Sequence, residues 1–153
     1  MLSRPTTEQI LLDCCNDLMS GVLPALTDET AIVRLVMVET VMRNMAVRAA
    51  HEVAWMRAET VAIEEYASAV AAGCPNAKDV VAALEDLAAA PSASLHLDDV
   101  VDTYLLAGRA FSAALEAAVA GGVRELITRG EELLDQRADA ETEVMAGWSP
   151  TGR

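Results

Sequence analysis

Aromatic residues and positive charges are both scarce in this chain. Aromatic side chains make up 3% of the 153 residues, Lys78 is the single lysine, and 11 basic residues stand against 24 acidic ones, for a net charge of −13. Sequence-independent binding to nucleic acid needs a cluster of Lys and Arg that displaces counterions, and a polybasic membrane patch needs the same cluster. The composition therefore argues against nucleic-acid partners and against electrostatic binding to a membrane.

Long apolar runs and a cysteine framework are also missing. No stretch of roughly 18 apolar residues is free of charge, so we expect no transmembrane helix. Residues 1–8 contain no apolar signal-peptide core. The three cysteines, Cys14, Cys15 and Cys74, are an odd number and have neither zinc nor thioredoxin spacing. We therefore expect a cytoplasmic protein with no membrane association and no cofactor, whose thiols are small buried apolar side chains.

Helix-forming residues dominate what is present. Hydrophobic residues make up 53% of the chain, and alanine and leucine, the best helix formers, are prominent among them. Apolar residues recur every three to four positions, whereas the alternation typical of strands is hard to find. The pattern predicts an all-α fold: a single helical-bundle domain of about five helices over residues 1–146, followed by a non-helical tail over 147–153 that contains Trp148.

Local signals predict the ends of the first two helices. Thr6 and Gln9 form a capping-box pattern, which places the start of the first helix near Thr7. A second helix is expected over residues 28–73, because neither Gly nor Pro interrupts that stretch before its end. A continuous helix of this length would span roughly 65 Å at about 1.5 Å per residue. Such a helix either projects and pairs with another chain or breaks, and its apolar stripe weakens around residues 57–61.

Three more helices are expected in the C-terminal half. Asn76 should cap the third. Asp98 and Asp99 suit the start of the fourth, where Gly108 in the apolar stripe indicates close approach of a neighbouring helix, and Gly121-Gly122 should end it. A fifth helix is expected from the apolar residues after Gly122. The predicted buried stripe of the fourth helix consists of Val101, Tyr104, Leu105, Gly108, Phe111, Leu115 and Val119.

No catalytic signature is present, and two alternatives to a non-enzymatic role stay open. Neither histidine, His51 or His96, follows a glutamate by three residues, as the Glu-x-x-His motif of a di-iron bundle requires. Glu52 and Glu59 lie one heptad apart near His51, so a metal-dependent bundle enzyme is the first alternative. The second alternative is a binding module for a small apolar or acyl ligand, with a pocket formed by Met42, Met45, Trp55 and Phe111.

The second helix is the main candidate for an interaction site. Val33, Val36 and Val41 lie off its main apolar stripe, so another helix or another subunit must cover that surface. A polar strip on the same helix, expected to form an interface, consists of Arg48, His51, Glu52 and Arg57. The predicted partner is a second copy, giving a homodimer, or a metabolic enzyme, giving a hetero-complex.

The N-terminal part of the chain resembles a known family. Arg4-Pro5-Thr6, the short helix to Leu18, the turn Val22-Leu23-Pro24-Ala25-Leu26 and the following helix to about Glu59 are similar to small uncharacterised bacterial all-helical proteins. These proteins are encoded beside aminoglycoside-phosphotransferase-like kinases and acyl-CoA dehydrogenases. The resemblance implies an accessory role next to an enzyme of small-molecule or acyl-CoA metabolism, and it implies no catalytic residue.

Overall fold

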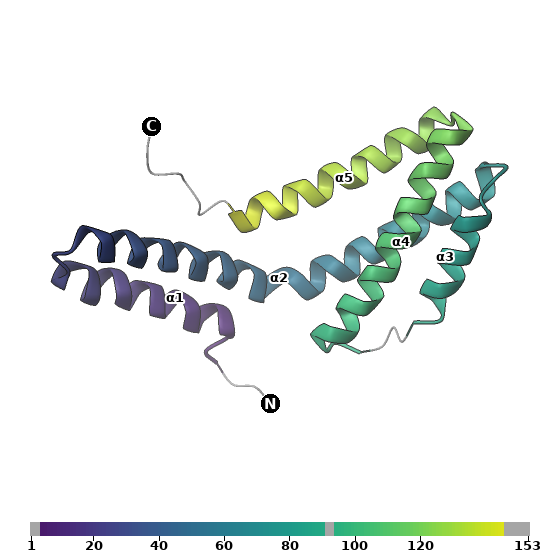
Figure 1. Ribbon diagram of the computed structural model, residues 1–153. Coiled ribbons are helices and arrows are strands. Elements are labelled where there is room, and N and C mark those ends of the chain that lie inside the picture. The colour runs from purple at the N-terminus through teal and green to yellow at the C-terminus, as the bar shows by residue number, and fades with distance from the viewer. Residues whose placement is uncertain (1–3, 91–93, 146–153) are drawn as a thin grey trace. The chain divides into compact units, whose positions relative to one another are not determined.

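The structure is a computed structural model that describes residues 4–90 and 94–145. Within these ranges the chain contains helices and turns and no strand, so the all-α prediction is confirmed (Figure 1). The helices are α1 (Thr7–Asp17), a π turn (Leu18–Val22), a 3-10 turn (Leu23–Ala25), α2 (Glu29–Gly73), α3 (Lys78–Ala88), α4 (Leu97–Gly121) and α5 (Arg124–Met145). The predicted tail, residues 147–153, lies outside the described residues.

The chain forms two compact units. The first comprises Met1–Glu52 and Ala140–Arg153, and the second comprises Val53–Asp139. Helices α2 and α5 each contribute to both units. The single domain expected over residues 1–146 stays a prediction, and each unit is described by itself.

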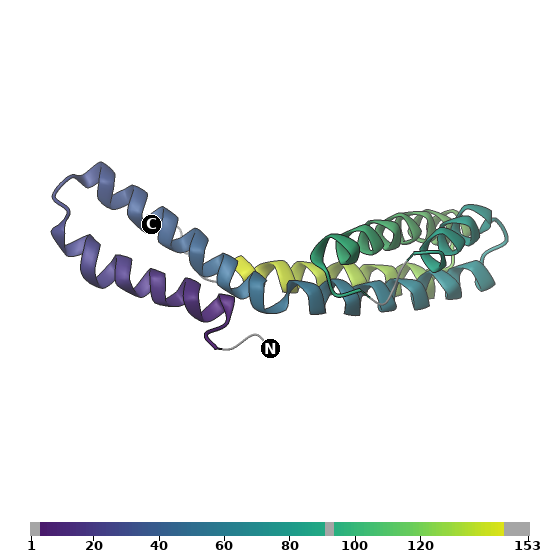
Figure 2. The same cartoon turned by 90° about the horizontal axis from the view of Figure 1, so that it is seen from below.

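The first unit contains α1 antiparallel to the N-terminal half of α2 (Figures 1 and 2), together with the end of α5 from Ala140. The capping box is formed as predicted: the N–H of Gln9 donates to Thr6 Oγ1 at 3.2 Å, and the N–H of Thr6 donates to Gln9 Oε1 at 2.9 Å. Asp28 caps α2, since its Oδ1 accepts the N–H of Thr30 at 2.9 Å. These side chains satisfy backbone donors that have no partner inside a helix.

Cys15 is the centre of the α1–α2 packing. Its side chain is buried, and its thiol donates to the carbonyl oxygen of Glu39 at 3.6 Å. Burial, followed by the charge of Glu39, raises the pKa of the Cys15 thiol, which keeps it protonated and unreactive. Cys14, by contrast, is exposed, so the prediction that all three thiols are buried is wrong for this one. Its neighbour takes the inward position, and adjacent residues point about 100° apart on a helix.

Helix α2 runs without interruption through residues 57–61, where a break was the alternative. The hydroxyl of Thr60, within that stretch, donates to the carbonyl oxygen of Met56 at 2.7 Å, as a threonine does inside a regular helix. The apolar stripe weakens here for a different reason. Glu59 occupies an inward position and is held by hydrogen bonds from α4 and α5.

The second unit packs α3, α4 and the flanking parts of α2 and α5 around one core. Residues from α3 and α4 contact each other closely, and the rings of Tyr66 and Phe111 meet with their centroids 5.7 Å apart. Of the predicted stripe of α4, Phe111 is buried and Leu115 packs against the core, whereas Leu105 and Val119 are exposed and small side chains take most of the buried face. Small side chains allow the axes of neighbouring helices to lie close together. The buried face of α4 is therefore displaced by about one residue from the predicted stripe. The fully buried alanines are Ala107, Ala110, Ala114 and Ala118.

The close approach of a neighbouring helix occurs at a different glycine from the one that the sequence indicated. A Cβ at Gly108 would meet nothing within 4 Å, so the predicted close approach there is wrong. The close approach is at Gly130 on α5, where a Cβ would lie 2.7 Å from Tyr66 Oη and 2.8 Å from Leu115 Cδ1. Gly122 ends α4 with φ of 64°, the left-handed conformation expected of a C-terminal glycine.

The start of α3 also differs from the prediction. Asn76 does not cap it, because the helix begins two residues later and Ala77 holds the N-cap position without a side-chain hydrogen bond. Ala77 is buried, so packing sets this boundary rather than capping. At the start of α4, Asp98 and Asp99 lie in the first turn as predicted, after His96. In the described parts of the chain, no helix is both long and apolar enough to cross a bilayer.

Candidate functional site

The N-terminal half of α2 has an uncovered apolar side, which we call the α2 face. Its residues are Val33 (58% exposed), Met37 (64%), Val38 (52%), Val41 (57%) and Met45 (40%). Large aliphatic side chains this exposed are common singly on protein surfaces. Five of them within four turns of one helix form a contiguous apolar patch, a feature that needs an explanation beyond chance exposure.

The α2 face points away from α1. Glu39 and Ala46 are the buried residues on the side of α2 that packs against α1, and Val41 follows Glu39 by two residues, which is roughly 200° around a helix. Helix α1 therefore covers one side of α2 and leaves the other. Met37, Val38, Val41 and Met42 line a shallow apolar hollow on the uncovered side.

This stretch of α2 is electrically neutral, although the chain as a whole carries −13. Its acidic residues are Glu29, Glu39 and Glu52, and its basic residues are Arg34, Arg43 and Arg48. Two of these pairs meet within the helix: Arg43 pairs with Glu39, and Arg48 Nε lies 3.5 Å from Glu52 Oε2. The α2 face thus lies on a stretch whose own charges cancel, so two copies of this stretch would meet without net repulsion between them.

The structure divides the predicted polar strip. Arg48 and Glu52 form an ion pair in the first unit, and His51 between them is exposed. Arg57 belongs to the second unit, where it borders a pocket. An interface made of all four residues stays a prediction, and the Arg48–Glu52 pair is the part that adjoins the α2 face.

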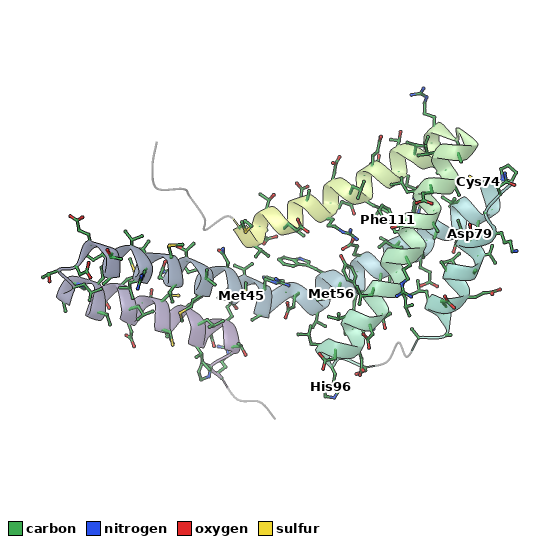
Figure 3. The ribbon with its side chains drawn as sticks, in the orientation of Figure 1. Met45, Met56, Cys74, Asp79, His96 and Phe111 are labelled. Atoms are coloured by element: carbon green, nitrogen blue, oxygen red, sulfur yellow. The ribbon has the colours of Figure 1, made fainter. Side chains whose placement is uncertain are left out.

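The four residues of the predicted ligand pocket also fall into two groups. Met42 and Met45 belong to the first unit, beside or on the α2 face, and Figure 3 labels Met45 there. Trp55 and Phe111 belong to the second unit, where Phe111 is buried against Tyr66. A pocket for an apolar or acyl ligand made of these residues stays a prediction.

A polar cluster in the second unit was not recognised from the sequence as a site. The carboxylate of Glu59 accepts two hydrogen bonds, from Tyr104 Oη at 2.7 Å and from Arg137 Nε at 2.6 Å, and its Oε1 forms an ion pair with Arg137 Nη2 at 2.5 Å. The guanidinium carbon of Arg137 also lies 5.8 Å from the centre of the Tyr104 ring and 5.9 Å from that of Phe111. The cluster joins α2, α4 and α5, and its one sequence signal is the gap in the apolar stripe of α2.

The electrostatics of this cluster favour structure over catalysis. Burial, together with the hydrogen bond to Glu59 and the charge of that carboxylate, raises the pKa of Tyr104 to about 12. A phenol that holds its proton this tightly does not act as a general base near neutral pH. Both oxygens of Glu59 are already engaged, which leaves this carboxylate little capacity for a metal ion.

The raised pKa of Tyr104 makes stability fall at high pH. An unfolded tyrosine loses its proton near pH 10, whereas the folded protein keeps it until about pH 12. The unfolded state therefore gains by ionisation between these values, and stability should decrease as the pH rises from about 10 to 12. Chemical denaturation across this range should show the decrease in a Tyr66→Phe background, and the additional change Tyr104→Phe should reduce it. An unchanged slope in the second variant would contradict the assignment.

A pocket of about 340 Å³ lies in the second unit, between α2, the end of α3 and the start of α4. Its lining mixes apolar side chains with Arg57, Glu64 and Asp99. The hydroxyls of Thr60 and Thr103 also border it, but each donates to a carbonyl of its own helix. Ligand sites are usually apolar cavities with a few convergent polar groups, and this lining differs from that pattern.

In the described ranges, no group of three or more His, Cys, Asp or Glu side chains is arranged to hold a metal ion. The alternative site of His51, Glu52 and Glu59 therefore has no geometric support there. No protein-family model, no curated protein and no solved structure matches the chain.

Proposed function

We propose that this protein is a non-enzymatic interaction protein that assembles through the α2 face. The observation that carries the proposal is the row of exposed aliphatic side chains from Val33 to Met45, on a helix whose opposite side is already packed. Removing apolar surface from water contributes roughly 25 cal/mol per Å², so covering this row stabilises any complex that forms there. Helix α1 packs on the other side of α2, and the row itself stays 40–64% exposed with the end of α5 present in the same unit.

The family resemblance between Arg4 and about Glu59 adds a context to this proposal. It includes the whole α2 face, and the proteins that it points to are encoded beside kinases and acyl-CoA dehydrogenases. We therefore place the protein as an accessory factor of small-molecule or acyl-CoA metabolism, acting as a homodimer or in a hetero-complex with a metabolic enzyme.

Cysteine labelling in cells of the native host tests whether a protein covers the α2 face. Met37→Cys, in a Cys14→Ser background, should react with a membrane-permeant maleimide at least about tenfold more slowly than Ser68→Cys in the same background. Ser68 is exposed on the same helix, in the second unit, and serves as the matched control. Adding Val41→Asp to the Met37→Cys variant should restore fast labelling, because an unpaired buried carboxylate disfavours the complex.

Two outcomes would contradict the proposal. Equal labelling of the two cysteines in cells would show that nothing covers the face. Slow labelling of the Met37→Cys variant that persists in purified monomer would show that the chain covers its own face. Far-UV circular dichroism should be the same for all variants, because each change is at an exposed position.

A further inference from the structure

We infer that the occupant of the α2 face is the same segment of a second copy of this chain, packed antiparallel. The inference rests on the proposed function and specifies its partner. Three observations carry it: the spacing of the residues along the face, the order of the charges at its ends, and its neutrality within an acidic chain.

The spacing is that of a coiled-coil seam. Residues that follow one another by four and three positions in alternation lie along one line of a helix and pack against a second helix. On α2 this line has an apolar centre, Val38, Val41 and Met45, between two charged ends. The seam consists of Arg34, Val38, Val41, Met45, Arg48 and Glu52.

The charges at the ends distinguish the two possible directions of pairing. In a parallel pair in register, each seam residue meets its own copy, so Arg34 faces Arg34 and Glu52 faces Glu52. Like charges that face each other are destabilising. In an antiparallel pair with its two-fold axis between Val41 and Met45, Val41 faces Met45 and Arg34 faces Glu52. Symmetry repeats each contact, so the dimer contains two complementary ion pairs.

The remaining seam residue is compatible with this register. Arg48 faces Val38 of the other copy, where its aliphatic stem can cover the valine while its guanidinium stays at the rim. In the monomer Arg48 already lies 3.5 Å from Glu52, and its side chain is 51% exposed. Glu52 can therefore hold Arg48 of its own chain and Arg34 of the second copy at once.

Area and net charge both fit a second copy. The segment from Glu29 to Glu52 is about 36 Å long, and half of its circumference presents about 600 Å². Two such faces bury about 1,200 Å² in total, the lower end of stable specific interfaces. The segment has as many basic as acidic residues, so two copies meet there without the repulsion that the chain's −13 would cause elsewhere.

Charge reversal at the two ends of the seam tests the inference by sedimentation equilibrium of the purified full chain. Arg34→Glu and Glu52→Arg should each weaken self-association at least about tenfold, or 1.4 kcal/mol, because each places like charges together twice. An equimolar mixture of the two variants should associate about as tightly as the parent, since both ion pairs are then restored. Arg109→Glu, an exposed charge reversal on α4, is the control and should change little.

Three results would overturn the inference. A purified parent that stays monomeric at high micromolar concentration would exclude self-association; slow labelling of the Met37→Cys variant in cells would then show that a different protein covers the face, and the proposed function would stand. Single variants that associate like the parent would exclude the Arg34–Glu52 contact. A mixture that associates more tightly than the parent, with unchanged single variants, would indicate parallel pairing.

Discussion

Replacing Gly130 with alanine is expected to lower the free energy of unfolding by about 2 kcal/mol, although alanine is the better helix former by about 1 kcal/mol. The added Cβ would lie 2.7 Å from Tyr66 Oη and 2.8 Å from Leu115 Cδ1, inside their van der Waals radii. Tyr66 is fully buried and packs against the Phe111 ring, so moving it would disturb the core. Denaturant unfolding monitored by circular dichroism would measure the loss.

Two further variants isolate the cause. Gly108→Ala should instead gain up to about 1 kcal/mol, since a Cβ there meets nothing within 4 Å. Tyr66→Phe removes the atom nearest to the new Cβ, so it should recover about half of the loss caused by Gly130→Ala. On its own Tyr66→Phe should be neutral or stabilising, because the Tyr66 hydroxyl is buried and has no hydrogen-bond partner among the described residues. Equal stabilities of Gly130→Ala and Gly108→Ala would refute the close approach of α5 to α2.

Glu59→Gln should cost the second unit about 2 kcal/mol of stability. The substitution keeps the size of the side chain but replaces one acceptor oxygen by a donor, so Arg137 or Tyr104 faces an NH₂ group. Hydrogen bonds to charged groups contribute about 1.5–3 kcal/mol each, and partial exposure of the pair, 21% for Glu59 and 33% for Arg137, reduces the value for each bond. Thermal or denaturant unfolding would measure the change.

A double-mutant cycle separates the ion pair from the rest of the cluster. Arg137→Gln combined with Glu59→Gln should cost less than the sum of the single changes, because much of each single effect comes from leaving the other charge without its partner. Glu65→Gln, at an exposed position on the same helix, should stay within about 0.5 kcal/mol of the parent. Strict additivity in the cycle would show that the contact contributes little to folding.

The helix boundaries that the sequence predicted correctly are those set by local chemistry. The Thr6–Gln9 capping box and the left-handed Gly122 each depend on hydrogen bonds between residues a few positions apart. A short stretch of sequence is therefore enough to predict them. The capping role of Asn76 was predicted wrongly because the burial of Ala77, a tertiary effect, moved the start of α3. A sequence pattern a few residues long shows that Asn76 is a good capping residue, but it does not show the tertiary packing that competes with this role.

Packing between distant elements was the part that the sequence could not supply. Periodicity predicted an inward stripe on α4 whose Phe111 is indeed buried, but small residues took most of the inward side in place of Leu105 and Val119. The inward position of Glu59 is visible in the sequence only as an interruption of the apolar stripe of α2. Its hydrogen-bond partners, Tyr104 and Arg137, lie on other helices, so the pattern of α2 could not identify them. For the candidate site the sequence did better in part: of the three valines off the main stripe of α2, Val33 and Val41 are exposed on the α2 face and Val36 is half-buried.

The buried alanines of α4 limit which mutations this protein can accept during evolution. A single-nucleotide change in an alanine codon yields mostly larger residues, such as valine, threonine, aspartate or glutamate. At Ala107, Ala110, Ala114 and Ala118 each of these would have to fit where no surface is free. At these four positions, random mutation therefore destabilises the core by adding side-chain volume more often than by creating a cavity. Inherited change should be tolerated least at positions whose side chain is a single methyl group.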